Sequence, residues 1–186
     1  KAALQQLAVS YDVGRGVAKE FPMRGSPIDR TDDTLSEQID AAVARLETQM
    51  GAKLGDPDNP LLVSVRSGAR HSMPGMMDTV LDLGLNDVSV EGLARQTDRR
   101  FAFDSYRRFI QMYARIVQGL PAEGFDRRFE GAKALAAVDN DADVPAEVLE
   151  FLVAIFQRTV AELSGAHFPQ DPREQLRGAT EAVFSS

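Results

Sequence analysis

The sequence predicts a helix-rich α+β fold with a few short strands. Three stretches, residues 35–50, 106–117 and 148–163, carry apolar side chains at the three- and four-residue spacing of a buried helix face. The run Leu61–Val65 is too short for such a helix and is rich in apolar and β-branched residues, which is typical of a buried strand. With 44% hydrophobic and 26% charged residues the composition is ordinary globular usage, and 186 residues suit one domain or two small ones.

The first 33 residues differ in character from the rest of the chain. Lys1–Val9 has only enough apolar spacing for a short helix, and the irregular residues 11–33 contain three glycines and two prolines. Glycine and proline at this density are typical of loops. We therefore interpret residues 1–33 as an N-terminal segment and linker, and residues 34–186 as the folded part.

The folded part begins with a predicted helix over Leu35–Met50. Thr34 and Glu37 have the spacing of a capping box, in which each side chain satisfies a backbone N–H of the first turn. Gly51 follows the last apolar position and is a typical helix terminator.

The next elements after Leu61–Val65 are short. Thr79–Leu83 is apolar with a β-branched start, so we expect a second strand or an extended segment there. Asn86–Asp87 then predicts a turn, and Val90–Arg95 the start of a short helix.

A long helix is predicted to begin near Asp104 or Ser105, either of which can cap it, and to end before the next glycine. Its apolar stripe leaves Arg107, Arg108 and Arg115 on other faces. These arginines indicate either a basic face near a nucleotide or an ordinary solvated helix face.

Three more helices are predicted towards the C-terminus. The weakest pattern covers Phe125–Val138. Pro145 is expected in the first turn of a helix that Gly165 closes, and Asp171–Glu174 has the residues of a second capping box, which opens the last helix.

The most distinctive stretch follows the predicted strand Leu61–Val65. Arg66 stands at the strand end, where a rigid backbone can present its planar guanidinium to two phosphate oxygens at once. Gly68 and Gly75 let a backbone approach an anion closely, and Ser67 and Ser72 offer hydroxyl donors. The composition indicates a phosphate-binding loop; the alternative is a tight surface turn with a structural arginine.

Several motifs resemble one family, pyruvate phosphate dikinase, in its N-terminal nucleotide-binding domain of the ATP-grasp type. The resemblance covers the chain from about Leu35 to its last residue. The matching runs are Val63-Ser-Val-Arg-Ser-Gly-Ala-Arg70, Ser72-Met-Pro-Gly-Met-Met-Asp-Thr79, Leu83-Gly-Leu-Asn-Asp87, the segment Phe101–Tyr113, Phe168-Pro-Gln-Asp-Pro172, Gln175-Leu-Arg-Gly-Ala179 and Ala182-Val-Phe184.

The resemblance implies that residues 34–186 are a partial ATP-grasp nucleotide-binding domain with a helical subdomain. It implies an enzyme that uses ATP and Mg²⁺ to interconvert ATP, phosphate and pyruvate with AMP, pyrophosphate and phosphoenolpyruvate. The nucleotide-binding residues that it implies are Arg66, Ser67, Gly68, Arg70, Ser72, Met73 and Gly75. The segment Ser72–Met77 would close over the phosphates.

The same resemblance places the catalytic histidine in a central phosphohistidine domain outside this chain, and the metal-binding carboxylates and adenine pocket beyond Ser186. This chain is therefore expected to hold no catalytic residue and no metal ligand, and to be inactive alone. The full-length enzyme is expected to be a cytoplasmic homodimer.

Two departures and two alternatives accompany this interpretation. The family begins with a Gly-Gly-Lys-Gly segment, whose lysine contacts nucleotide, followed by a Pro-rich strand, and neither has a match here. Phosphoenolpyruvate synthase shares a related Val-Arg-Ser core but not the run Ser72–Thr79, so a synthase-like dikinase is the first alternative. The second is a non-enzymatic helical interaction module that keeps the loop as a structural turn.

Charge and composition exclude other classes. A net charge of −7 and a pI near 4.9 argue against nucleic-acid binding. The absence of cysteine removes disulfides and thiolate chemistry, and no apolar run approaches the ~20 residues that span a bilayer.

Other catalytic or metal motifs are weak. The acidic run Asp139–Asp143 lacks the glycine and glutamate of a calcium loop, since Val144 and Glu150 stand at those positions. His71 lies in the loop without a recognisable partner, and we expect a structural role for His167.

Overall fold

The computed structural model of the protein describes residues 33–66 and 79–185, and it confirms the helix-rich α+β class. In chain order the elements are α2 (Asp33–Met50), β1 (Lys53–Leu54), β2 (Pro60–Leu61), β3 (Val63–Arg66), β4 (Thr79–Leu83), α3 (Ser89–Gln96), α4 (Arg99–Ile116), α5 (Glu123–Ala136), the short 3-10 helix η1 (Asp141–Asp143), α6 (Ala146–Ser164) and α7 (Pro172–Ser185).

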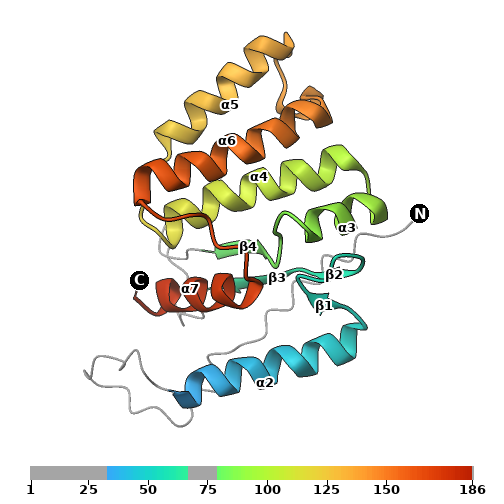
Figure 1. Cartoon of the computed structure of the whole chain (residues 1–186), viewed down its shortest axis with the longest axis vertical. Coiled ribbons are helices and arrows are strands. Elements are labelled where there is room, and N and C mark those ends of the chain that lie inside the picture. Colours follow the sequence, from blue (N-terminus) through green and yellow to red (C-terminus); the bar gives the residue numbers. More distant parts are fainter. Residues whose placement is uncertain (1–32, 67–78, 186) are drawn as a thin grey trace.

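Helices α5, α6 and α4 lie in a row on one side of the small β3–β4 hairpin, and α7 and α2 lie on the other side, as Figure 1 shows. Helix α4 is central: it packs against α6, α3 and β4, and α5 packs against the far side of α6. Helix α7 contacts β3 and β4, so the β3–β4 hairpin lies between α4 and α7. None of the described helices is long and apolar enough to cross a bilayer.

The strands form two separate two-stranded sheets. Strand β1 pairs in parallel with β2, and β3 pairs antiparallel with β4. The prediction of one buried strand over Leu61–Val65 is therefore wrong in two respects. The run is divided between β2 and β3, and only its first residue, Leu61, is fully buried. A two-stranded hairpin has no neighbouring strand on either edge, so its side chains are only partly covered.

Helix α4 begins five residues before the predicted start. Asp98 is the capping residue, and its carboxylate accepts a hydrogen bond of 2.8 Å from the backbone N–H of Phe101. The predicted caps, Asp104 and Ser105, therefore lie inside the helix. The apolar pattern extends back to Phe101 and Phe103, which pack as part of the helix rather than ahead of it.

Most of the remaining helix limits lie close to their predicted signals, but α2 begins at Asp33, so Thr34, the predicted capping residue, lies inside the helix. Gly165 closes α6 with a φ of +74°, and its N–H donates to the carbonyl of Ala161. Pro145 stands one position before the first turn of α6. At the start of α7 the Asp171 carboxylate accepts a 2.9 Å hydrogen bond from the backbone N–H of Arg173.

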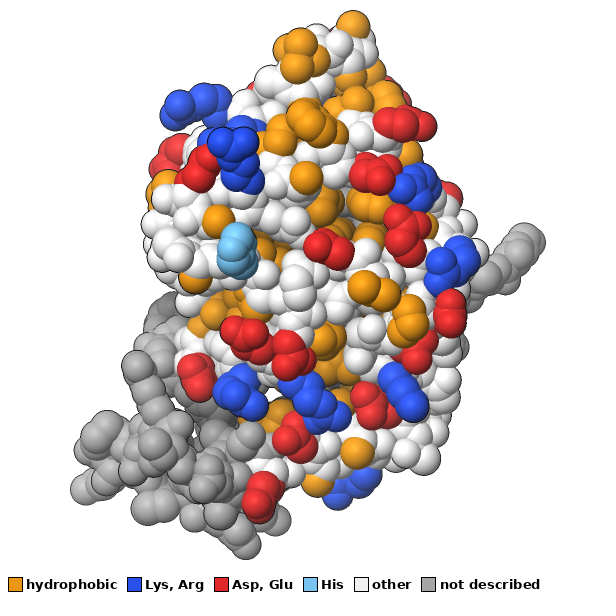
Figure 2. Space-filling view, viewed as in Figure 1, with side chains coloured by type: hydrophobic (Ala, Val, Ile, Leu, Met, Phe, Trp, Pro, Cys, Tyr) orange, Lys and Arg blue, Asp and Glu red, His pale blue; other side chains and the backbone are white. Residues whose placement is uncertain are grey.

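The core is built around the buried face of α4. Tyr106, Phe109 and Tyr113 surround the ring of Phe168, with edge-to-face contacts at centroid distances of 5.6–6.3 Å. Phe168 belongs to the segment between α6 and α7, so this cluster ties the C-terminal part of the chain to α4. On the face in Figure 2, acidic and basic side chains are interspersed over this core.

Candidate functional site

Arg66 is the last residue of β3, as predicted, and it lies opposite Thr79 in the hairpin. Residues 67–78 therefore join two chain ends that lie side by side. The Arg66 side chain is exposed, and no carboxylate within residues 33–66 or 79–185 forms an ion pair with it. A guanidinium in this position is accessible to an anion.

The other predicted nucleotide-binding residues lie outside the described residues. They are Ser67, Gly68, Arg70, Ser72, Met73 and Gly75, and the same holds for His71. Their roles stay predictions. His167 is exposed and outside the buried core, which gives no support to the structural role expected of it.

A bulge in β4 shapes the hairpin that carries Arg66. Two residue steps of β3, from Val63 to Val65, oppose three residue steps of β4, from Leu83 back to Val80. Asp82, within this part of β4, has a φ of +59°. Bulges of this kind bend a strand and increase its twist, which re-aims the end of the hairpin. Burial raises the pKa of the Asp82 carboxyl, and the positive charge of Arg108 opposes that rise.

Gly84 ends the hairpin where no larger residue fits. Its φ is +109°, and a Cβ atom there would lie 2.7 Å from the carbonyl oxygen of Leu61. The strand end can therefore pack against the β2–β3 junction only because residue 84 has no side chain.

Gln175 of α7 holds this strand end from the other side. Its side chain is fully buried; Oε1 accepts a 3.1 Å hydrogen bond from the N–H of Gly84, and Nε2 donates to the carbonyls of Leu85 and Pro169 at 2.8 Å each. Both N–H groups and the oxygen of the Gln175 amide form hydrogen bonds inside the protein. Gln175 thus fixes the end of β4 to α7.

A second set of hydrogen bonds extends this connection to α4. The Gln170 carbonyl accepts from the Asn86 amide at 3.0 Å, and the Gln170 side chain accepts from the N–H of Asp87 at 2.9 Å. The hydroxyl of Tyr106 donates to the Asp87 carboxylate at 2.9 Å, and burial raises the pKa of Tyr106 far above its ordinary value.

These two sets show what the remaining motifs do. The runs 83–87, 101–113 and 168–179 are distant in sequence, yet they form one hydrogen-bonded unit behind the hairpin. These runs are recognisable in the sequence, but the supporting role of Gln170 and Gln175 is not. Prolines lie close to both glutamines in the sequence, but this weak signal does not reveal their hydrogen-bond partners.

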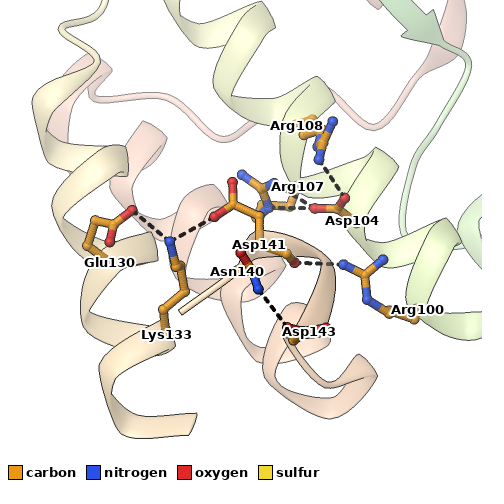
Figure 3. Close-up of polar contacts among 9 residues, drawn as sticks. All are labelled: Arg100, Asp104, Arg107, Arg108, Glu130, Lys133, Asn140, Asp141 and Asp143. Atoms are coloured by element: carbon orange, nitrogen blue, oxygen red, sulfur yellow. Dashed lines mark hydrogen bonds and ion pairs between the residues drawn. The ribbon is translucent and has the colours of Figure 1, made fainter. Parts of the chain in front are cut away.

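The predicted basic character of α4 is partly wrong, because Arg107 is neither on a basic surface nor on a solvated face. Figure 3 shows its guanidinium directed at Asp104, with hydrogen bonds of 3.1 and 2.6 Å to the same carboxylate oxygen. The side chains of the pair are only 5% and 11% exposed. The guanidinium carbon also lies 4.0 Å from the centre of the Phe129 ring.

The neighbouring charges complete a network between α4, α5 and η1 (Figure 3). Arg108 is 60% exposed and pairs with the second oxygen of Asp104 at 3.0 Å. Lys133 of α5 pairs with Asp141 of η1 at 2.8 Å, and the Arg100 guanidinium donates to the Asp141 carbonyl at 2.7 Å. Within the described ranges no three metal-ligating side chains are grouped to hold an ion. Residues 139–143 are exposed, and Asp141 among them forms the ion pair with Lys133.

No protein-family model matches the chain. It is, however, 51% identical over 154 residues to the pyruvate, phosphate dikinase of Clostridium symbiosum, which covers 82% of this chain and 18% of that protein. Two other relatives, pyruvate, phosphate dikinase 2 of Oryza sativa subsp. japonica and pyruvate, phosphate dikinase of Rhizobium meliloti, are each 49% identical over 82% of this chain and 17% of their own length.

These relatives are dikinases, so over most of its length the chain is homologous to phosphotransferases. These three relatives are named pyruvate, phosphate dikinase, and the chain is a homologue of one segment of that enzyme. The chain spans less than a fifth of the length of the relatives that it matches.

Proposed function

We propose that this chain is part of the ATP-binding domain of a pyruvate, phosphate dikinase, and that this domain is of the ATP-grasp type. The observation that carries the proposal is the position of Arg66: exposed, at the rigid end of β3, and without a carboxylate partner among the described residues. The homology to dikinases supplies the class of reaction, and the position of Arg66 supplies a group that can act in it.

In this proposal Arg66 binds phosphate oxygens of ATP. Its guanidinium is planar and permanently charged, so it can donate two parallel hydrogen bonds to a phosphate and neutralise charge that shifts during phosphoryl transfer. The backbone of β3, held by Thr79 across the hairpin, fixes where this charge stands. Positioning and electrostatic stabilisation are the main contributions that a protein makes to phosphoryl transfer.

The segment 67–78 supplies the rest of the proposed contacts from this chain. Ser67 and Ser72 are proposed to donate through their hydroxyls, and Gly68 and Gly75 to let backbone N–H groups approach the phosphates. Arg70 adds positive charge and Met73 belongs to the part that closes over the nucleotide.

The whole enzyme is proposed to interconvert ATP, phosphate and pyruvate with AMP, pyrophosphate and phosphoenolpyruvate. The phosphoryl group passes to a histidine of a phosphohistidine domain outside this chain, and the full-length enzyme is proposed to be a homodimer. Bound Mg²⁺ would neutralise phosphate charge and orient the phosphates. We assign no metal ligand to this chain.

The proposal is tested by Arg66→Ala in the full-length enzyme. We expect formation of AMP and pyrophosphate to fall at least about a hundredfold, because one charge that stabilises the transition state is lost. Arg66→Lys should recover only part of the rate, since an ammonium cannot make the bidentate contact. The melting temperature should stay nearly unchanged because Arg66 is exposed.

Arg158→Ala is the matched control, since Arg158 is 81% exposed and pairs only locally with Glu162 of the same helix. This variant should keep full turnover. If Arg66→Ala also keeps it, the phosphate-binding role of Arg66 is wrong.

A second measurement concerns the chain alone. We expect the 186-residue chain to bind ATP too weakly for calorimetry, because the metal ligands and adenine pocket are proposed to lie elsewhere in the enzyme. Micromolar affinity would show instead that this chain holds a complete nucleotide site.

A further inference from the structure

A hollow of about 250 Å³ lies where α3, α4 and α6 meet, away from the β3–β4 hairpin tip. Its lining includes the apolar side chains of Val90 and Phe103 and three carboxylates, those of Asp87, Glu91 and Glu150. Figure 2 shows acidic side chains bordering apolar surface over α4 and α6. The hollow therefore combines apolar walls with a negatively charged rim.

The rim has more negative than positive charge. Arg99 bridges Glu91 and Glu150 at 3.0 and 2.8 Å and lies 4.7 Å from the centre of the Phe103 ring. This arrangement shows that the site accommodates a guanidinium on an aromatic wall between carboxylates. The single positive charge of Arg99 offsets only one of the three negative charges of these carboxylates.

Asp87 has no cationic partner among the described residues. One of its carboxylate oxygens accepts hydrogen bonds from Tyr106 Oη at 2.9 Å and from Gln157 Nε2 at 2.5 Å. These neutral donors hold the carboxylate in place without cancelling its charge. Asp87 lines the hollow, and its other oxygen accepts no hydrogen bond from the described residues.

The size and chemistry of the hollow favour one basic side chain over other cations. Within residues 33–66 and 79–185 no three acidic side chains are grouped closely enough to hold a metal ion. The volume is below the roughly 300–1,000 Å³ of pockets that enclose a whole small-molecule ligand. A lysine or arginine fits both features, because its narrow apolar stem can enter a hollow of this size while its charged end reaches Asp87 at the rim.

The surface beside the hollow indicates that this side chain comes from a protein segment. Val88, next to Asp87, is 59% exposed, and Phe151, next to Glu150, is 66% exposed. A free amine inside the hollow would leave both uncovered, whereas a polypeptide would bury them along with its basic side chain. We infer that this surface is a docking site for a protein segment that presents a lysine or arginine between apolar residues.

Methyl NMR of the full-length protein tests this inference, with Val90 and Val153 as reporters inside the hollow. The probes are three blocked tripeptides: Leu-Lys-Leu, Leu-norleucine-Leu and Gly-Lys-Gly. We expect saturable shifts with Leu-Lys-Leu at a Kd on the order of 1–10 mM, and at least about tenfold weaker binding of both other peptides. Added salt should weaken the Leu-Lys-Leu complex.

Three variants locate the interaction. The double change Asp87→Asn and Glu150→Gln keeps the shape and the internal hydrogen-bond acceptors but removes two charges, and should weaken Leu-Lys-Leu at least about tenfold. Glu147→Gln, on the same helix but outside the hollow, should have no effect. Phe151→Ser should reduce Leu-Lys-Leu towards the affinity of Gly-Lys-Gly, and unchanged melting temperatures establish that the variants fold.

Three results would overturn the inference. Equal binding of the norleucine peptide would make the hollow an apolar cleft rather than a cation site. Equal binding of Gly-Lys-Gly, together with no effect of Phe151→Ser, would make it a site for a free cation and not a docking surface. If the methyl signals of Val90 and Val153 do not shift at the highest peptide concentration, the hollow binds neither a cation nor an apolar side chain.

Discussion

Removal of only one partner of the buried Asp104–Arg107 pair should lower the free energy of unfolding by several kilocalories per mole. In Asp104→Ala the Arg107 guanidinium would stay buried against Phe129 without its hydrogen-bonded carboxylate, and only the weaker attraction of Asp141 would remain. Burial already lowers the pKa of Arg107, and the hydrogen bonds that Arg107 donates to Asp104 oppose that effect. Leaving a buried charge unpaired costs about 3–5 kcal/mol of unfolding free energy.

For a chain of this size each kcal/mol corresponds to roughly 2–4 °C, so Asp104→Ala should lower the melting temperature by about 10 °C. Arg107→Met keeps most of the apolar stem and leaves Asp104 paired with Arg108, so it should cost less. The double variant should be more stable than the sum of the two losses predicts, by at least about 1–2 kcal/mol.

Urea unfolding of the parent, the two single variants and the double variant measures these quantities. Arg108→Ala is the control, and it should cost less than about 1 kcal/mol because its guanidinium is largely in water. A loss below about 1 kcal/mol in Asp104→Ala, or strict additivity in the double variant, would refute the claim that the pair is energetically buried.

Three further predictions concern the support of the hairpin and the packing of the helices. Gln175→Leu leaves the buried N–H of Gly84 without an acceptor, so it should cost about 2–4 kcal/mol and speed amide hydrogen exchange in the turn after β4. Because burial raises the pKa of Asp82, the folded protein holds that proton more tightly than the unfolded chain, and stability falls as pH rises from 3.8 through the raised folded pKa. Asp82→Asn, which also suits the positive φ, should therefore be more stable than the parent at pH 7, with the gain vanishing below about pH 4 in denaturation at the two pH values. Gly92→Ala would collide with a backbone carbonyl and should lower the melting temperature, whereas Gly131→Ala meets nothing within 4 Å and should add roughly 0.5–1 kcal/mol of helix stability; a gain in the first or a loss in the second would contradict the packing.

Local signals predicted most of the secondary structure, and they failed where a stronger neighbour competed. Asp104 has the chemistry of a helix cap, but Asp98 stands ahead of it, and the apolar residues between them extend the helix. Arg107 falls off the apolar stripe of α4, yet α5 covers that face and brings Phe129 over it. Helical periodicity predicts the buried face of a single helix, but it does not predict where a neighbouring helix packs.

The candidate site was predictable to a similar extent. Arg66 was found from its place after an apolar run, and the structure confirms that it ends a strand and is exposed. The supporting residues Gln170 and Gln175 were not found, because in the sequence a glutamine that forms hydrogen bonds within the protein looks the same as one that forms them with water. Only their partners, 83 to 91 residues away, distinguish them.

By itself, the sequence determined the helix-rich class, most helix limits, the strand that presents Arg66 and the homology to a segment of pyruvate, phosphate dikinase. Each of these depends on residues close together in the chain or on whole motifs. The tertiary structure alone decided that Asp104 and Arg107 are buried together and that Gln175 fastens α7 to the end of β4. It also decided that α3, α4 and α6 enclose an acidic hollow. These three features depend on which elements pack together. Packing brings into contact side chains that are far apart in the sequence, and their positions in the sequence do not indicate that contact.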